Sequence, residues 1–317
     1  MPTFSILMPV YNGEEYIAAA VESVLSQTFR DLELVILDDG SKDASLRMIQ
    51  EFQRREPRIR IVSRVNQGHV RTQNELIGRA NGKLVAFIAQ DDIYTIERLA
   101  RQVAWLDANP EFDALCGSFS TIDASGRVVS DMQCGLQALE ITDELRSGKV
   151  RTHISTYAFR AEALARVGGF REYFESAEDI DLQLRLGEIG RIGYVPESFY
   201  LYRLHSSSIT HTLGNARREF FDRVAYDFQK QRRTSGLDDL QRGNPPPKPE
   251  VSRSPGNSAG AHVQGVLLGR AWREHGAGMK VTALGTGLRA VVENPLSLTA
   301  WKSLVALAIK RSGRTPS

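Results

Sequence analysis

Two adjacent carboxylates, Asp91 and Asp92, follow the apolar segment 84–89, separated from it only by Gln90. Neighbouring carboxylates repel each other unless a cation or hydrogen-bond donors are present. Mg²⁺ and Mn²⁺ prefer oxygen ligands and are commonly held by one or two carboxylates together with substrate phosphates. Asp is also favoured at the start of a helix, and a helix is expected from about Thr95. From these two residues alone, a Mn²⁺ or Mg²⁺ site and a helix cap are equally good interpretations.

A second acidic pair, Asp38-Asp39, stands before Gly40 and Ser41 at the end of the apolar run Leu32–Leu37. An ordinary strand-to-helix turn explains this pair when it is considered alone. A carboxylate at the same position of a doubly wound sheet can also accept a hydrogen bond from a nucleotide base. The pair therefore predicts either a turn or a base-binding residue.

A third acidic group, Glu178, Asp179 and Asp181, opens a helix expected over 177–187. Acidic residues in a first turn are stabilised by the helix dipole whatever their function. A helix N-terminus at a site is also a suitable place for a general base. We expect Asp181 to face away from the other two, because residues two apart do not share a helix face.

The segment Tyr202–Ser208 combines a permanent cation, Arg203, with the imidazole of His205 and several hydroxyls. This combination suits a diphosphate leaving group. A solvated loop is the alternative interpretation, and for His205 alone a structural or surface role is favoured.

These side chains need elements that bring them together. Apolar runs predict strands at 4–10, 32–37, 59–62 and 84–89, separated by helices over 14–27, up to about 55 and over 72–79. Such alternation predicts an α/β fold with a mostly parallel sheet and right-handed crossovers. Ligands bind at the carboxyl ends of parallel strands, so we expect the polar strand ends to converge on one crevice.

The later chain is less regular. Short strands are expected at 114–119, 157–159 and 192–196. The sequence predicts a catalytic domain over 1–216, a helical extension over 217–242, a flexible Pro/Gly/Ser linker over 243–260 and a basic helical region over 261–317. The last region contains helical patterns at 261–275, 279–293 and 298–310.

The charge of the 317-residue chain is divided unequally. Residues 1–216 hold 23 Lys+Arg and 30 Asp+Glu, whereas residues 217–317 hold 17 and 8. An acidic body argues against a nucleic-acid enzyme and, if it binds phosphates, calls for a metal. Cys116 and Cys134 are too few for a disulfide framework, and no apolar run is long enough to span a membrane. With no signal-peptide pattern at the start, we expect a cytoplasmic protein.

The motifs together resemble those of the family 2 glycosyltransferases, which are inverting enzymes of the GT-A fold. The resemblance covers about residues 3–212, and its blocks occur in the family's order. These blocks are Pro9-Val10-Tyr11-Asn12, Ser26-Gln27-Thr28, Asp38-Asp39-Gly40-Ser41, Asn66-Gln67-Gly68 with Asn74, Asp91-Asp92 with Glu97-Arg98-Leu99, Gly168-Gly169-Phe170, Glu178-Asp179 and Tyr202-Arg203-Leu204-His205.

The resemblance implies a role for each matching position. Asp39 would bind a uracil-type base, Asp91 would lie near the ribose and Asp92 would ligate the metal. Asp179 matches the family's general base, with Glu178 as its neighbour. The remaining implied positions are Pro9, Val10 and Tyr11 lining the base pocket with Glu14 beside it, Arg203 and His205 facing the diphosphate, and His153, Ser155 and Arg160 near the acceptor.

Two positions depart from the family pattern. The first Asp of the Asp-x-Asp-Asp motif is Ala89 here, so metal binding would rest on Asp92, with help from His205. The Arg that usually precedes the last Asn of the Asn-x-Gly block is Gln73, and Arg71 is the residue that could replace it.

The implied function is transfer of a sugar, with inversion, from a nucleoside-diphosphate sugar such as a UDP-sugar to a hydroxyl acceptor. The resemblance points to bacterial cell-surface polysaccharide or lipid-linked glycan synthesis. A sugar-1-phosphate nucleotidyltransferase is an alternative, but Tyr11-Asn12-Gly13-Glu14 is not the Gly-rich phosphate loop it needs. A catalytically silent nucleotide-sugar-binding module is a second alternative, against which Asp92 and Asp179 both argue.

The basic end of the chain suits an amphipathic helix on anionic lipid, which would place the protein peripherally at the inner face of a membrane. Packing against the catalytic domain or a second subunit is at least as good an interpretation. The residues that carry this pattern are Trp301, Leu304, Val305 and Ile309 with Lys302, Lys310 and Arg311.

Overall fold

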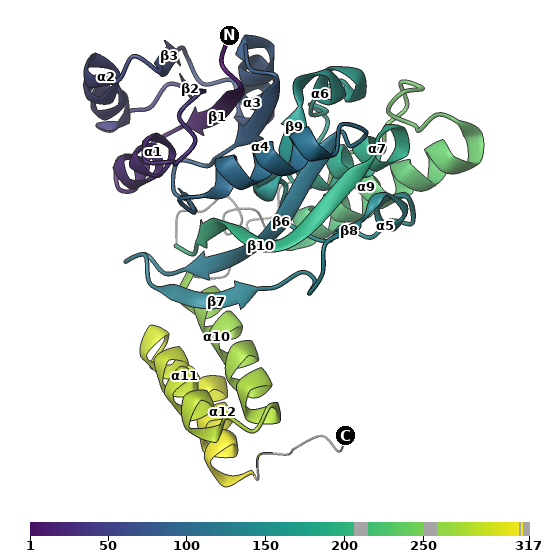
Figure 1. Cartoon of the computed structure of the whole chain (residues 1–317). Coiled ribbons are helices and arrows are strands. Elements are labelled where there is room, and N and C mark those ends of the chain that lie inside the picture. The colour runs from purple at the N-terminus through teal and green to yellow at the C-terminus, as the bar shows by residue number, and fades with distance from the viewer. Residues whose placement is uncertain (206–214, 250–258, 311, 313–317) are drawn as a thin grey trace. The chain divides into compact units, whose positions relative to one another are not determined.

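The computed structural model describes residues 1–205, 215–249, 259–310 and 312 (Figure 1). The chain forms two compact units, each built from separate stretches of sequence. The first unit comprises Met1–Phe119, Gln133–Tyr202 and Ala216–Val251, and the second comprises Ser120–Met132, Arg203–Asn215 and Ser252–Ser317. The contiguous domains expected from the sequence stay a prediction.

The first unit begins with four parallel strands joined by helices (Figure 1). Strand β1 lies between β2 and β4, and β3 follows β2 at the edge of the sheet. All four therefore end at the same edge, as the sequence predicts. The bounds are β1 (Phe4–Val10), α1 (Ile17–Leu25), β2 (Leu32–Asp38), α2 (Ser45–Arg55), β3 (Ile59–Ser63), α3 (His69–Arg79) and β4 (Leu84–Phe87).

The central strands are apolar on both faces because helices cover both. Ile6 and Met8 of β1 pack with residues of α1, α2 and α4 (Arg98–Ala108). Leu7 points to the other face and packs with residues of α3 and α7 (Glu178–Ile189). Successive side chains of a strand alternate between faces, so an uninterrupted apolar run is typical of such a buried strand.

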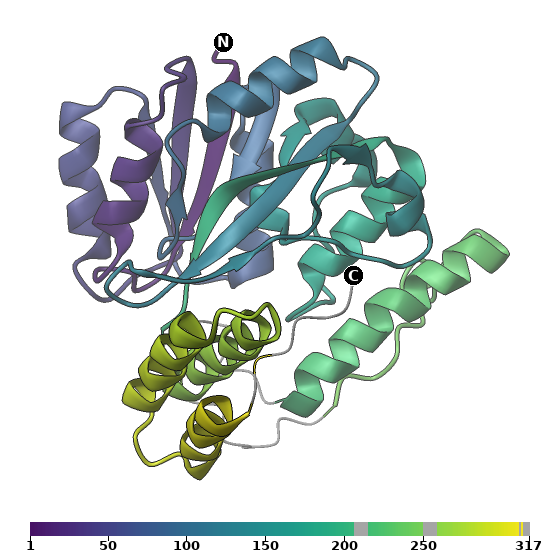
Figure 2. The same ribbon diagram turned by 60° about the horizontal axis from the view of Figure 1, so that its bottom comes forward.

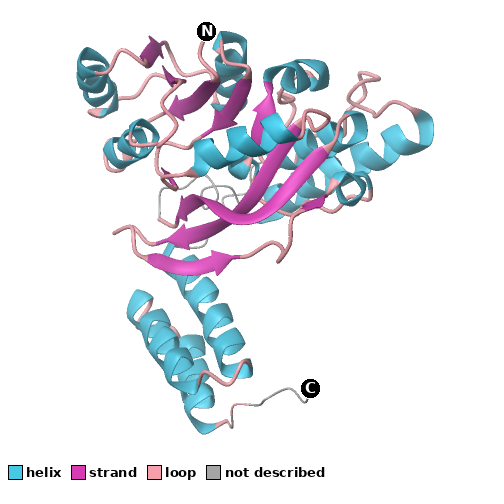
Figure 3. Cartoon of the chain, viewed as in Figure 1, coloured by secondary structure: helices cyan, strands magenta, loops and turns pink. Residues whose placement is uncertain are grey.

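Beyond β4 the sheet also contains antiparallel pairs, which makes it a mixed α/β sheet (Figure 3). Strand β9 runs antiparallel to both β4 and β6. The remaining elements of this part are β5 (Ile93–Tyr94), β6 (Ala114–Ile122), β8 (Leu139–Glu140), α5 (Thr142–Arg146), η1 (Ile154–Thr156), β9 (Ala158–Arg160), α6 (Ala161–Val167), β10 (Ile192–Arg203) and α9 (Asn215–Ser235).

Several element boundaries differ from the sequence expectation, and two of these differences have a clear physical reason. Helix α3 begins at His69 rather than near Thr72, directly after Gly68, whose φ of 92° favours glycine. Strand β10 continues past Pro196 to Arg203. The polar residues after that proline end the apolar run, but Phe199 and Tyr200 return to the core and extend the strand.

A buried ion-pair network anchors helix α7. Asp181 is fully buried and accepts from Arg171 and Arg185. Arg171 also donates to Asp238, 2.6 Å away, which lies just beyond α9. The expectation that Asp181 faces away from Glu178 and Asp179 is confirmed, and its role is to anchor the helix.

Among its described residues, the second unit contains β7 (Val128–Met132) and the helices α10 (Ala259–Gly276), α11 (Lys280–Glu293) and α12 (Leu298–Ile309) (Figure 2). These helices occupy the three segments for which helical patterns are expected. Helix α11 buries small residues such as Ala283 and Gly287. Of the expected linker, residues 244–249 are irregular, and 250–258 lie outside the described residues. In the described chain, no helix combines the length and apolarity needed to cross a membrane.

Candidate active site

The carboxyl ends of β1 and β4 are joined through Gln90. Its side-chain Oε1 accepts from Tyr11 N at 2.8 Å, and its Nε2 donates to Tyr11 O at 3.1 Å. Gly13 allows this approach, since a Cβ there would lie 2.5 Å from the Gln90 amide carbon. Tyr11 is exposed, Pro9 is half-buried and Val10 belongs to the core. Of the three residues expected to line a base pocket, Tyr11 is the one whose side chain is open to solvent.

The acidic pair after β2 is held by hydrogen-bond donors. Asp38 accepts from Ser41 N at 3.2 Å and from Ser63 Oγ at 2.8 Å. Asp39 accepts from Gln67 N at 2.8 Å, from Gly68 N at 3.0 Å and from the Arg64 guanidinium. A carboxylate offers about four acceptor positions, so these three donors leave Asp39 the capacity for one more.

The Glu14 side chain stabilises the N-terminal end of α2. Its Oε2 accepts from Ala44 N at 2.8 Å, which satisfies one of the backbone donors that a helix N-terminus leaves unpaired. The position beside a base pocket that the resemblance implies for Glu14 stays a prediction.

Asp92 is buried at the carboxyl end of β4. The hydroxyl of Tyr200 donates to its Oδ2 at 2.7 Å and accepts from Ala89 N at 3.1 Å. The neighbouring Asp91 is half-buried. Across the described residues, no group of three or more His, Cys, Asp and Glu side chains is arranged to hold a metal ion. Two adjacent hard oxygen donors nevertheless match the ligands that Mg²⁺ and Mn²⁺ take when substrate phosphates supply the rest.

The buried guanidinium of Arg98 lies near the ring of Tyr200, whose hydroxyl binds Asp92. The guanidinium of Arg98 lies 3.8 Å from the ring centre of Tyr94 and 5.6 Å from that of Tyr200, and it donates to Tyr157 O at 3.0 Å. Arg98 is fully buried. Its contacts fix the Tyr200 ring that holds Asp92.

The pair Glu178-Asp179 occupies the first turn of α7, after Ala177 in the left-handed conformation with φ 59°. Oε1 of Glu178 lies 3.4 Å from Nε2 of His69, the first residue of α3. The structure therefore brings the start of α3, next to the Asp39 loop, against the start of α7.

The two carboxyls of this pair differ in acidity. Burial and the charge of Glu178 raise the pKa of Asp179 to about 7. For Glu178, burial acts in the opposite direction, but the hydrogen bond and charge of His69 prevail and lower its pKa. One carboxyl is thus ionised, while the other exchanges a proton near neutral pH, as a general base should.

His153 and Ser155 lie next to this pair within the first unit. Burial lowers the pKa of His153 to about 4, so the ring is neutral at pH 7. Its Nδ1 accepts from Ser155 N at 3.3 Å, and the ring packs 5.5 Å from that of Tyr202 and 6.4 Å from that of Tyr200. The expected contact of His153 and Ser155 with an acceptor stays a prediction.

Three arginines bind protein groups that the sequence does not reveal. Arg71 forms an exposed ion pair with Glu172 at 2.8 Å. Arg160 donates to the carbonyl oxygens of Phe112 and Leu106, so it joins α4 to β9. Arg203 donates to the carbonyl oxygens at 123 and 124 at 3.1 and 3.0 Å. Their roles toward substrate stay predictions.

The expected metal ligands lie in different units. His205 is a buried residue of the second unit, and Asp92 belongs to the first. The joint metal site therefore stays a prediction, and Ser206–Ser208 lie outside the described residues.

Two residues with contacts at the site escape the sequence reasoning, namely His69 and Tyr200. His69 directly follows the Asn66-Gln67-Gly68 block, and its place at the start of a helix beside that block is a signal that could have singled it out. Tyr200 lies in the part of β10 beyond Pro196, which the apolar pattern does not assign to a strand.

The family model of glycosyl transferase family 2 matches residues 5–174. The chain is 30% identical over 211 residues to a chondroitin synthase of Escherichia coli, which covers 66% of this chain and 30% of that protein. It is 27% identical over 218 residues to EpsJ of Bacillus subtilis, an uncharacterized glycosyltransferase, which covers 66% of this chain and 63% of that protein. The chain spans less than two thirds of each relative.

Solved structures share the architecture. The crystal structure of S. aureus TarS 1–349 in complex with UDP-GlcNAc matches with a TM-score of 0.62 and 19% identity over 96% of this chain and 79% of that one. The complex of the same fragment with UDP gives 0.55 and 22% over 74% of each chain. These similarities confirm the expected GT-A fold. Because the family model covers more than half of its residues, the chain belongs to glycosyl transferase family 2.

Proposed function

We propose that this protein transfers a sugar, with inversion, from a nucleoside-diphosphate sugar to a hydroxyl group, and that Asp179 is the general base. The observation that carries the proposal is the Glu178-Asp179 pair in the first turn of α7, where burial and the charge of Glu178 raise the pKa of Asp179 to about 7. The complexes of TarS with UDP and UDP-GlcNAc support a UDP-sugar as the donor. The relation to a chondroitin synthase supports a glycan acceptor in polysaccharide synthesis.

The proposed reaction is a single displacement. The acceptor hydroxyl attacks the anomeric carbon from the face opposite the diphosphate, and its proton passes to Asp179. The bond from the anomeric carbon to the phosphate oxygen breaks, and the electron pair leaves with the nucleoside diphosphate. A positioned base typically contributes about 10²–10⁴-fold to such a rate.

Asp91 and Asp92 are the residues that would hold a divalent metal. A bound Mn²⁺ or Mg²⁺ would neutralise charge on the diphosphate leaving group. Tyr200 orients Asp92 by donating to Oδ2. On this basis, chelation of divalent ions should abolish transfer, and Asp92→Asn should raise the Mn²⁺ concentration needed to restore it.

Asp179→Asn tests the proposed base. We expect nucleotide-sugar binding to persist while transfer falls by about 10²–10⁴-fold, measured as release of UDP from a panel of UDP-sugars with Mn²⁺. The matched control is Asp143→Asn, because Asp143 is a fully solvated acid in the first turn of α5. Full transfer by Asp179→Asn would overturn the assignment.

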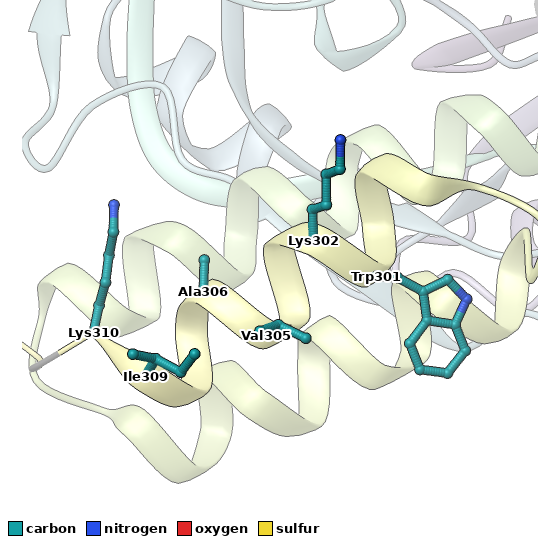
Figure 4. Close-up of a pocket in the computed structure, with 6 residues that line it drawn as sticks. All are labelled: Trp301, Lys302, Val305, Ala306, Ile309 and Lys310. Carbon is teal, nitrogen blue, oxygen red and sulfur yellow. The ribbon is translucent and has the colours of Figure 1, made fainter.

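We also propose that the second unit contacts an anionic membrane through α12. Leu298, Trp301, Val305 and Ile309 repeat along one side of this helix and are 47–76% exposed. Figure 4 shows Lys302 and Lys310 extending beside the row formed by Trp301, Val305 and Ile309. From residue 294 to the end, the sequence has four basic and no acidic residues. Apolar side chains flanked by cations match the surface of an anionic bilayer, which supports a peripheral location at the cytoplasmic face.

Flotation of the full chain with phosphatidylserine-containing vesicles tests this contact. We expect binding at low salt, none to neutral vesicles, and loss of binding in Trp301→Ser. Leu136→Ser is the control, since Leu136 is an exposed residue of the first unit. Failure to float at low salt would overturn the proposal, and a dimer in solution would then identify a second copy as the occupant.

A further inference from the structure

In the first unit, His69 lies between the acidic pair Asp38-Asp39 and the acidic pair Glu178-Asp179. It follows Gly68, whose N–H donates to Asp39 Oδ2 at 3.0 Å. Its own Nε2 lies 3.4 Å from Glu178 Oε1 and 2.8 Å from the side-chain nitrogen of Gln73. Gly68 thus binds Asp39 through its backbone, and the next residue, His69, places its imidazole beside the first turn of α7.

The contacts of Gln73 indicate that Nε2 of His69 carries a proton. As placed, Gln73 directs its amide nitrogen at Nε2, and its buried Oε1 has no partner among the described residues. The oxygen and nitrogen of an amide are exchangeable assignments, and turning the group by 180° makes Oε1 the acceptor at Nε2. An N–H at Nε2 then faces both Gln73 Oε1 and Glu178 Oε1.

The charges around His69 favour its cationic form. Burial opposes protonation, but the hydrogen bond and charge of Glu178, with the charges of Asp179 and Asp39, prevail and raise the pKa of His69. Around the carboxyl pair, His153 faces Glu178, while Asp222 of α9 faces Asp179. Tyr157 and Tyr226 also lie within electrostatic reach of Asp179. Glu178 and Asp222, whose charges raise the pKa of Asp179, are both acidic.

We propose that His69 is a positioning residue that keeps Glu178 ionised, so that Asp179 is the carboxyl of the pair that takes up and releases the proton. This inference rests on the proposed role of Asp179 as base. His69 touches neither sugar nor phosphate in the step, and its own protonation state is the same before and after transfer. Without the cation, the two adjacent carboxyls would share the proton, so Asp179 would be partly ionised at lower pH and the last proton would leave the pair only at higher pH.

The test is the pH dependence of kcat in His69→Gln and His69→Arg. His69→Gln keeps a hydrogen-bonding side chain but removes the charge, so the single rise of kcat with pH should spread into two steps, one below and one above the midpoint of the unmodified protein. His69→Arg restores a cation, so its pH profile should return toward the single rise of the unmodified protein. Donor KM should change by less than threefold in both. His275→Gln, in the second unit, is the control for loss of a histidine.

The outcomes separate this inference from the proposed function. If both His69 variants lose kcat equally with a single-step pH profile, while Asp179→Asn is inactive, His69 is only structural and the inference fails. If Asp179→Asn retains full transfer, the proposed base fails and this inference fails with it. Should His69→Gln not fold, judged by its thermal transition, a two-step pH profile in His69→Arg would overturn the inference.

Discussion

The acidic residues after β2 and those that open α7 are held in opposite ways. Asp38 and Asp39 accept from backbone N–H groups, from a serine hydroxyl and from Arg64. Asp179 instead lies beside Glu178, and this second carboxylate opposes its ionisation. The same residue type thus builds a fixed anionic scaffold at one end of the site and a proton-exchanging group at the other.

The difference shows how the environment of a carboxyl assigns its task. Donors that surround a carboxylate stabilise its anion and fix its geometry, which suits recognition of a nucleotide base. A neighbouring anion and burial make proton uptake easier, which suits a base that must accept a proton at neutral pH. Sequence position alone does not separate the two tasks, since both pairs stand just before or at a helix start.

The largest effects should separate kcat from KM. Asp179→Asn should lower kcat by about 10²–10⁴-fold with little change in donor KM. Asp39→Asn places an amide nitrogen against N–H donors, and the unpaired groups should weaken donor binding by about 1–3 kcal/mol, roughly 5- to 150-fold in KM. Steady-state kinetics of both variants measures the split. A fall in kcat alone for Asp39→Asn would erase the distinction between the two regions.

Asp38→Ala should act on stability. It leaves Ser41 N and Ser63 Oγ without their acceptor, and burial makes such a loss cost about 1–3 kcal/mol. Urea unfolding followed by circular dichroism measures the change in the free energy of unfolding. An unchanged midpoint in urea would show that the scaffold does not depend on this carboxylate.

The pH dependence of kcat should follow the ionisation of Asp179. The base must be ionised to accept a proton, so kcat should rise with pH through a midpoint at about 7 and level off above it. Glu178→Gln removes the adjacent negative charge, which lowers the pKa of Asp179 and moves the midpoint to lower pH. A midpoint that rises in Glu178→Gln would contradict the coupling between the two carboxyls.

Glu14→Gln should have the smallest effect. It replaces a charged acceptor at Ala44 N with a neutral one, so the loss of stability should be about 0.5–1 kcal/mol. Donor KM should change by less than threefold. A larger rise in KM with unchanged stability would return Glu14 to the base pocket that the family resemblance implies.

The parallel half of the fold is predictable because its signals are local. Strand β1 has the bounds that its apolar run predicts, Phe4–Val10, and β2 extends the predicted run by one residue to Asp38. Such strands are covered by helices on both faces, so every residue is selected for burial. The second part of β10 was not predicted, because Pro196 and the polar residues after it interrupt the apolar pattern although the chain continues as a strand.

The site is predictable to the extent that its chemistry lies in short motifs. Asp92 and Asp179 stand out because acidic pairs beside a strand end or a helix start are readable from local sequence. The partners of Arg71 and Arg160 are not readable, since Glu172 and the carbonyl oxygen of Phe112 come from distant segments that only the fold brings near. His69 escaped for the same reason, because its partner Glu178 lies on another helix.

The buried network of Asp181, Arg171 and Asp238 also bears on how this chain can be dissected. The family match ends at residue 174, yet the helix that carries Asp179 is tied through Arg171 to Asp238, beyond α9. A fragment ending near residue 216 would leave Arg171 without one of its buried partners, a loss that costs about 3–5 kcal/mol in such networks. Truncated or chimeric proteins that aim to retain transfer should therefore keep the chain through Gly243, where the turn after Asp238 closes.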